Sequence, residues 1–193
     1  VISGWTSFAG TIEKVTIADS TFVEGNYNQL RFYQDVEITN TVFNKEMNID
    51  FGTANVEATF DGCSVEDGSS LLDVIYLPDI AEMGVKVEVN GEQVVVEAMI
   101  GDTAYLTLQD AFAAAKAGDT LVITAGSYTT NINVNKDITV VGQTDAQGNN
   151  LVNITGKLNV TADGATVRNL NVNNGSSTAG YISAKDVLIE GCE

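Results

Sequence analysis

Short stretches of this chain alternate between apolar and polar residues and then close on a turn residue. VTIADSTF at 15–22 returns as VEITNTVF at 36–43 and again as ATFDGCSV at 58–65, so the spacings are 21 (36 − 15) and 22 (58 − 36). In an extended strand, alternate side chains point to the same face, so the apolar members of each stretch share one buried face. The pattern predicts a recurring short strand closed by a small or amide residue, and these closing residues are Asp19, Asn40, Gly62 and Gly191.

One strand that recurs about every twenty residues, with loops of variable length between copies, is typical of a solenoid. Stacking such units in parallel gives a β-helix, in which each inward residue lies on its equivalent in the next coil. Near the other end, Leu170 and Ile189 are expected in similar slots, at a spacing of 19 (189 − 170). A β-sandwich also has evenly spaced strands, but a common terminal phrase on each strand favours the β-helix.

A different pattern occupies the middle of the chain. VKVEVNGEQVVVE (85–97) alternates on both sides of Asn90-Gly91, a strong hairpin signal, and a second turn at Gly101-Asp102 would complete a three-stranded meander. A short amphipathic helix is expected at about 108–117. Its capping pair is Thr107 and Asp110, its apolar face is Leu108, Ala111, Phe112 and Ala115, and its stop is Gly118. This helix would cover the open end of a β-helix.

The segment EAMIGDTAYLTLQDAFAAAKAGDTLVITAGSY (97–128) resembles a module that recurs in large, repetitive surface proteins of Gram-positive gut bacteria. In those proteins the phrase opens a right-handed parallel β-helix of the pectate-lyase-like superfamily. DITVVG (137–142) and ATVRNLNV (165–172) are similar to early coils of that superfamily. The resemblance implies a mainly β chain with two partial stacks of right-handed parallel β-helix coils, joined by a hairpin or meander and one capping helix.

The two ends of the chain carry related phrases, and this similarity suggests a domain organisation. Val187 matches Val15 at an offset of 172 (187 − 15), which we interpret as the repeat length of a longer parent protein. Residues 1–84 would then be the last coils of one unit, 85–106 a hairpin or meander junction, and 107–193 the capping helix and first coils of the next unit. Contacts to neighbouring repeat units of the parent chain are expected.

Composition and charge narrow the classes of partner. The net charge is −17, from 26 acidic and 9 basic residues, which disfavours nucleic acid and anionic lipid surfaces as partners. No apolar run is long enough to span a membrane. Cys63 and Cys192 each follow a Gly in a similar phrase, and we expect two equivalent inward positions rather than a disulfide.

The residues needed for catalysis in the resembled superfamily are missing or scattered. The chain has no His, so the usual Ser-His triad cannot form and the two thiols cannot complete a zinc coordination shell. Neither Arg31 nor Arg168 lies beside an acidic cluster of the kind that binds Ca²⁺ in pectate lyases. Asp61, Asp119 and Asp145 are interpreted as turn residues. We therefore expect a protein that is not an enzyme, with no catalytic residues, no bound metal and no cofactor.

Two surfaces remain as candidates for binding. EGNYNQLRFYQD (24–35) gathers Tyr27, Arg31 and Tyr33 around Phe32, and Tyr and Arg are frequent anchors of protein interfaces. Alternation would bury Phe32 and turn Arg31 and Tyr33 to solvent; the structural alternative is one core Phe with amphipathic rim residues. The other surface is rich in Asn. We expect these residues mainly at coil corners, and the functional alternative is a site that binds sugar hydroxyls. The Asn residues are Asn131, Asn133, Asn135, Asn153, Asn159, Asn169, Asn171, Asn173 and Asn174.

These observations and the resemblance together predict a non-catalytic binding module of a repetitive bacterial cell-surface protein, extracellular or secreted. The expected partner is a host extracellular protein such as an immunoglobulin or a mucin-type glycoprotein, bound through Tyr27, Arg31 and Tyr33. The choice of a host protein comes from the location that the resemblance implies. A structural stalk or spacer and a carbohydrate-binding remnant of a polysaccharide lyase-like enzyme are the alternatives.

Overall fold

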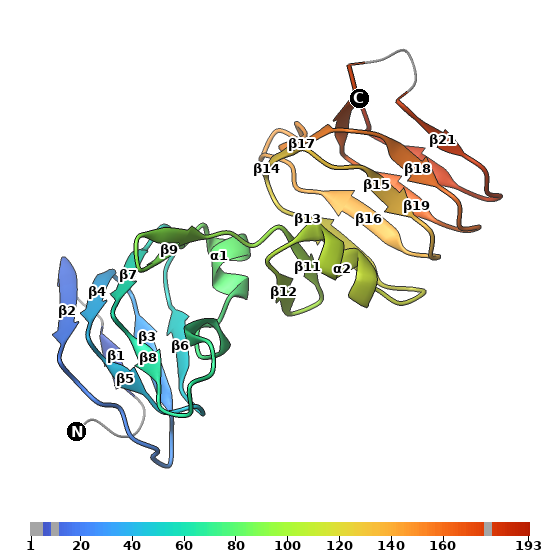
Figure 1. Cartoon of the computed structure of the whole chain (residues 1–193). Coiled ribbons are helices and arrows are strands. Elements are labelled where there is room, and N and C mark those ends of the chain that lie inside the picture. Colours follow the sequence, from blue (N-terminus) through green and yellow to red (C-terminus); the bar gives the residue numbers. More distant parts are fainter. Residues whose placement is uncertain (1–5, 9–11, 176–178) are drawn as a thin grey trace. The chain divides into compact units, whose positions relative to one another are not determined.

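The structure is a computed structural model that describes residues 6–8, 12–175 and 179–193 (Figure 1). The chain divides into two compact units, Val1–Val95 and Val96–Glu193. The fold is mainly β, with 44% of residues in strands and 9% in helices, and it forms a β-solenoid of about 8 turns. The predicted parallel β-helix coils are therefore confirmed.

In its described residues, unit 1 consists of short strands that stack coil upon coil, with two helical segments near its end. The strands fall into three sheets, in the orders β1-β3-β6, β10-β9-β7-β4-β2 and β5-β8. The elements are β1 (Thr6–Phe8), β2 (Lys14–Ala18), β3 (Gln29–Phe32), β4 (Asp35–Thr39), β5 (Val42–Phe43), β6 (Asn48–Phe51), β7 (Glu57–Asp61), β8 (Ser64–Val65), η1 (Leu71–Asp73), α1 (Pro78–Met83), β9 (Lys86–Val89) and β10 (Glu92–Val94).

Apolar residues at equivalent positions of successive coils build the core of unit 1. β2 pairs in parallel with β4, and β4 with β7, so that Ile17, Ile38 and Phe60 lie in register. Ile38 and Phe60 are fully buried, and the rings of Phe22 and Phe43 stack with centroids 5.3 Å apart. The spacings predicted from the repeated phrases thus correspond to successive coils.

The residues that close the strands form a column of left-handed backbone at one corner. Asp19, Asn40 and Gly62 have φ values of 47°, 48° and 62°, and Asn90 continues the column with 51°. Asn40 Nδ2 donates to Asp19 Oδ1 at 3.3 Å, and the Gly62 amide donates to Asn90 Oδ1 at 2.9 Å. Asn, Asp and Gly are the residues that tolerate this conformation, which explains why each phrase ends on one of them.

The two helical segments of unit 1, η1 and α1, were not predicted from the sequence pattern. Both are too short for a helical hydrophobic period to be visible, but each has local end signals. Ser70 and Asp73 form a capping box on η1. Pro78 begins α1, and Gly84 ends it with φ 67°.

Unit 2 repeats the same architecture, with one helix and three sheets in its described part. The sheets run β12-β11-β13-β16-β19-β22, β14-β17-β20 and β15-β18-β21. The elements are β11 (Ala98–Ile100), β12 (Thr103–Tyr105), α2 (Leu108–Ala114), β13 (Thr120–Ile123), β14 (Gly126–Tyr128), β15 (Ile132–Val134), β16 (Thr139–Gly142), β17 (Val152–Thr155), β18 (Leu158–Val160), β19 (Thr166–Arg168), β20 (Asn171–Asn173), β21 (Gly180–Ile182) and β22 (Leu188–Glu190).

The register of unit 2 corrects one predicted correspondence. β19 pairs in parallel with β22, and the partner of Ile189 is Val167 rather than Leu170. Leu170 is fully buried but lies beyond the end of β19, at the following inward position. The error arose because VRNLNV offers three apolar residues, Val167, Leu170 and Val172, and only strand pairing distinguishes them.

Helix α2 is close to the predicted one and packs on the first strands of unit 2. Its apolar face buries Leu108 and Ala111, the C-cap residue Ala115 is also buried, and the helix contacts β11, β12 and β13. Thr107 caps it, since Thr107 Oγ1 accepts from the Asp110 amide at 3.1 Å. The helix ends at Ala114, whereas the sequence pattern predicts an end at about residue 117, directly before Gly118. Three carbonyl oxygens around its C-terminal end accept hydrogen bonds from Lys136 Nζ, at 2.7 to 2.9 Å.

The predicted hairpin at Asn90-Gly91 is confirmed, but the three-stranded meander is wrong, because its strands belong to two different sheets. β9 and β10 form the hairpin, and β9 adds in parallel to β7 of unit 1. β11 and β12 form a second hairpin at Gly101-Asp102, and β11 adds antiparallel to β13 of unit 2. Residues 85–106 are therefore shared between the two units.

Candidate functional site

The segment that the sequence singled out for binding lies on β3 and the residues around it. Leu30 and Phe32 point into the core and are 1% and 0% exposed, whereas Arg31 is half-buried and Tyr33 is 38% exposed. The predicted alternation is thus confirmed: Phe32 is buried, and its two neighbours face outward. The role of these residues in binding stays a prediction.

Arg31 is fixed by a carboxylate on the neighbouring coil. Because β3 and β6 pair in parallel with Arg31 opposite Asp50, the two side chains meet on the outer face of the sheet. Arg31 Nη2 lies 2.6 Å from Asp50 Oδ2, and Nε lies 3.0 Å from Oδ1, a bidentate arrangement. Gln29 Nε2 also donates to Asp50 Oδ2, at 2.6 Å. The side chain of Asp50 is only 8% exposed, whereas that of Arg31 remains 39% exposed.

This pair has an electrostatic consequence for the surface. The hydrogen bond and charge of Asp50 raise the pKa of Arg31 above its ordinary value, so the guanidinium stays charged. The two hydrogen bonds to Asp50 also hold the Arg31 side chain in one conformation, so a partner that binds there does not have to order a flexible side chain. We refer to Gln29, Arg31 and Asp50 as the β3–β6 cluster.

Tyr33 borders the β3–β6 cluster and lies against the next coil. A Cβ atom added at Gly52 would collide with the ring of Tyr33, so the ring covers the bare backbone of Gly52. This close approach is one place where the fold requires Gly for space rather than for backbone conformation. The ring of Tyr33 is therefore supported on one side and open to solvent on the other.

Two residues of the same face were missed in the sequence. A parallel bridge pairs Ile49 with Ile75, which places Tyr76 beside Asp50 in the following coil, and Tyr76 is 39% exposed. Asp79, at the start of α1, is 7% exposed and accepts a hydrogen bond from the Phe51 amide at 2.7 Å. Sequence reasoning considered residues 24–35 as a local segment, and only coil stacking brings residues 50, 76 and 79 to it.

Burial makes Asp79 an unusual carboxyl. Desolvation raises its pKa, and the negative charge of Asp50 adds to the increase. The Phe51 amide and the positive charge of Arg31 act in the opposite direction, but the net direction is upward. The positive charge of Arg31 therefore interacts with both carboxyl groups: it pairs directly with Asp50, and it partly offsets the rise in the pKa of Asp79.

Tyr27 is the third residue predicted for binding, and it has a different setting. It lies in the loop before β3 and is 71% exposed, outside the hydrogen-bonded β3–β6 cluster. Asn28 Oδ1 accepts from the Gly25 amide at 2.7 Å, which orders the loop around it. Large exposed aromatic side chains on ordered loops are available as interface anchors.

The Asn-rich surface is built differently from the expectation. Asn169 is at a corner, with φ 59°, but the hydrogen-bonded Asn pairs lie within strands. Asn159 Nδ2 donates to Asn133 Oδ1 at 2.8 Å, and Asn171 Nδ2 donates to Asn153 Oδ1 at 3.0 Å. These amides pair with one another between coils, which is a structural role, and the predicted corner placement is wrong for these four residues.

The two cysteines occupy equivalent positions, as predicted, and both are free thiols. Cys63 Sγ lies 3.4 Å from the Ile38 carbonyl oxygen, and Cys192 Sγ lies 3.9 Å from that of Val167, so each thiol contacts the same point of the preceding coil. Burial raises the pKa of the Cys63 thiol. Each thiol is half-buried beside its core, so neither is fully enclosed.

Two of the Asp residues predicted to lie in turns, Asp119 and Asp145, accept hydrogen bonds from backbone amides of their own turns. Asp145 Oδ1 accepts from the amides of Gln147 and Asn149, at 2.9 and 2.8 Å, and Asp119 Oδ2 accepts from the Lys116 amide at 2.7 Å. Within the described ranges, no group of three or more His, Cys, Asp or Glu side chains could hold a metal ion. Nor does that part of the chain contain a helix long and apolar enough to cross a membrane.

Comparison of the chain with protein-family models, curated proteins and solved structures found no match. The class of protein therefore rests on the fold itself, which is a parallel β-solenoid in two units. Solenoids present long, regular outer faces, and the β3–β6 cluster with its neighbouring tyrosines is the candidate site on such a face.

Proposed function

We propose that this chain is a non-catalytic binding module of a bacterial cell-surface protein, extracellular or secreted, of the kind that the segment 97–142 resembles. Its partner is a host extracellular macromolecule, an immunoglobulin or a mucin-type glycoprotein. The contact is made through Tyr27, Arg31 and Tyr33 on the outer face of unit 1.

One observation carries this proposal: Arg31 is held bidentate by Asp50 and remains 39% exposed, beside a tyrosine that rests on Gly52. Aromatic and Arg side chains that are ordered before binding lose little conformational entropy on complex formation. Tyr76 enlarges the same face. The strand face offers planar hydrogen-bond donors and aromatic rings together, which suits either a protein surface or a glycosylated one.

The test measures binding of the purified chain to purified immunoglobulin and to purified mucin, by surface plasmon resonance. Tyr27→Ala is the most informative variant, because a 71% exposed side chain can be removed at little cost in folding. Tyr33→Ala and Arg31→Lys complete the set, since Lys keeps the charge but loses the bidentate geometry. Each variant is expected to weaken binding by about tenfold or more if its residue is an anchor.

The matched control is Arg168→Ala in unit 2, where Arg168 Nε pairs with Glu190 Oε2 at 3.0 Å and the side chain is 43% exposed. This variant removes an Arg of similar exposure that lies outside the predicted contact, and it should leave binding unchanged. If the wild-type chain binds neither macromolecule, the binding function fails. If it binds and all three unit 1 variants bind equally well, the interface lies elsewhere.

A structural stalk or spacer is the second candidate, and one observation favours it. The chain joins two solenoid units in succession, an arrangement that extends a polypeptide by adding repeats. A spacer predicts no binding to either probe and no effect of any variant on the outer face. A carbohydrate-binding remnant would instead bind glycans released from mucin, without binding immunoglobulin.

A further inference from the structure

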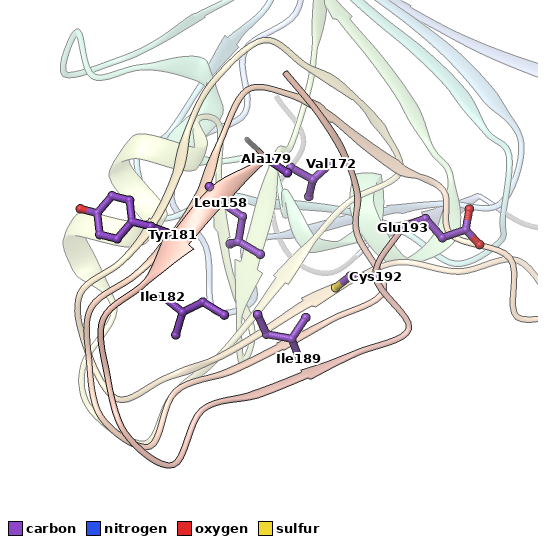
Figure 2. A pocket seen from close by; sticks show the side chains of 9 residues that line it. Leu158, Val172, Ala179, Tyr181, Ile182, Ile189, Cys192 and Glu193 are labelled. Carbon is purple, nitrogen blue, oxygen red and sulfur yellow. The ribbon is translucent and has the colours of Figure 1, made fainter. Parts of the chain in front are cut away.

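The outer face of the sheet β15-β18-β21 in unit 2 carries a column of matched side chains. Parallel pairing sets Asn133 beside Asn159, and Asn159 beside Tyr181. In a strand, successive side chains point to opposite faces. Figure 2 shows Leu158 and Ile182 pointing to the inner side, whereas Tyr181 points away from it. Tyr181 is 56% exposed, so the column presents amide groups and one aromatic ring to solvent.

This face is polar but almost uncharged, although the chain has a net charge of −17. The segments 131–135, 157–161 and 179–183 contain no Asp or Glu, and Lys157 is their one charged residue. The residues directly before and after the three strands are all exposed, and they are Asn131, Asn135, Lys157, Thr161, Ala179 and Ser183. Amide and hydroxyl groups, which both donate and accept hydrogen bonds, therefore dominate the surface.

Three of the amide groups are held in place by the fold. Asn159 Nδ2 donates to Asn133 Oδ1 at 2.8 Å, and Asn131 Oδ1 accepts from the Lys157 backbone amide at 2.8 Å. A side-chain amide has two N–H donors and two acceptor lone pairs, so one such bond does not exhaust it. A ligand that binds here would therefore meet ordered polar groups and would lose little side-chain entropy in fixing them.

These features fit a neutral oligosaccharide better than other classes of ligand. Each sugar hydroxyl donates and accepts, which matches amide and hydroxyl side chains, and the C–H face of a sugar ring packs on an aromatic ring such as that of Tyr181. A protein interface has an apolar core, which a single Tyr does not supply. An anionic glycan or a nucleic acid would be repelled by the net charge of the chain, against which Lys157 is a single cation.

We propose that the outer face of β15-β18-β21 binds a neutral oligosaccharide. One sugar ring stacks on Tyr181, and the hydroxyl groups of its neighbours exchange hydrogen bonds with the amides of Asn159 and Asn133. The sugar chain thus runs from coil to coil across the strands. This inference goes beyond the proposed function, because it assigns a separate site to unit 2, whereas the proposed contact lies on unit 1.

The experiment titrates the isotope-labelled chain with cellotetraose, maltotetraose, xylotetraose and chitotetraose, and with tetragalacturonate as the anionic counterpart. The side-chain amide signals of Asn133 and Asn159 are followed by NMR. At least one neutral oligosaccharide is expected to shift them, and tetragalacturonate is not. Tyr181→Ala removes an exposed ring at little cost in folding. This variant and Asn133→Ala are each expected to weaken binding by about fivefold or more.

The matched control is Asn153→Ala on the neighbouring sheet β14-β17-β20. Asn153 Oδ1 accepts from Asn171 Nδ2 at 3.0 Å, so this variant, like Asn133→Ala, removes the acceptor of a bond between two Asn side chains. Its column continues with Ser127 and presents no aromatic residue among the described positions, so binding should be unchanged.

Three results would overturn the proposal. The first is that none of the neutral oligosaccharides shifts the amide signals of Asn133 and Asn159. The second is that tetragalacturonate binds as tightly as the best neutral oligosaccharide. The third is that Tyr181→Ala and Asn133→Ala bind no more weakly than Asn153→Ala. The melting temperature of each variant is measured alongside, and the amide shifts of the unsubstituted chain report on the site even if a variant fails to fold.

Discussion

Phe60 and Ile189 each come three residues before one of the equivalent cysteines, Cys63 and Cys192, but their burial differs. Phe60 is 0% exposed and Ile189 is 37% exposed. Truncation of a fully buried Phe to Ala costs about 3 to 5 kcal/mol, as the sum of lost transfer free energy and the cavity that remains. A buried Ile loses about 2 to 5 kcal/mol, so Ile189→Ala, with about two-thirds of its side chain covered, should cost only about 1 to 3 kcal/mol. We expect Phe60→Ala to be the more destabilising change.

The assay is thermal unfolding, with hydrogen exchange measured on the same variants so that the loss of protection can be assigned to Val1–Val95 or to Val96–Glu193. For a unit of this size, each kcal/mol lowers the melting temperature by about 4 to 8 °C. Phe60→Ala should therefore lower that of unit 1 by more than about 12 °C. If Phe60→Ala costs no more than Ile189→Ala, β9 does not cover Phe60 as its pairing with β7 indicates, and the reasoning from burial fails.

Three further substitutions test the corner column and the buried carboxyl. Gly91→Ala should cost about 1 to 2 kcal/mol from its φ of 79° alone, since no atom lies within 4 Å of the new Cβ. Gly62→Ala should cost more by urea unfolding, because its Cβ would lie 2.7 Å from Asn40 Oδ1, and the addition of Asn40→Gly should remove the difference. Asp79→Asn should stabilise the chain at pH 7, because the raised pKa of Asp79 means that folding favours its protonated form. That advantage should vanish as the pH falls to the ordinary Asp pKa of 3.8. Melting curves of both proteins recorded between pH 7 and pH 3.8 check this, and a difference in melting temperature that stays constant over that pH range would contradict a raised pKa.

The candidate site shows what local sequence can reveal. The alternation of QLRFY at 29–33 was enough to predict that Phe32 is buried and that Arg31 and Tyr33 face out, because a strand places successive side chains on opposite faces. The partner of Arg31 could not be predicted in this way. Asp50 lies in the next coil, and the length of the intervening loop decides which residue comes opposite Arg31.

By itself, the sequence determined the class of fold, the direction of its side chains and the residues at its corners. Those features depend on period, on backbone preference at residues such as Asn40 and Gly62, and on local capping such as that of Thr107. Only the tertiary structure decided the strand register, the assignment of the two hairpins to separate sheets, and the placing of Tyr76 and Asp79 on the same face as Arg31. The physical reason is that parallel pairing joins residues a whole coil apart, and loops of unequal length hide that correspondence from any local pattern.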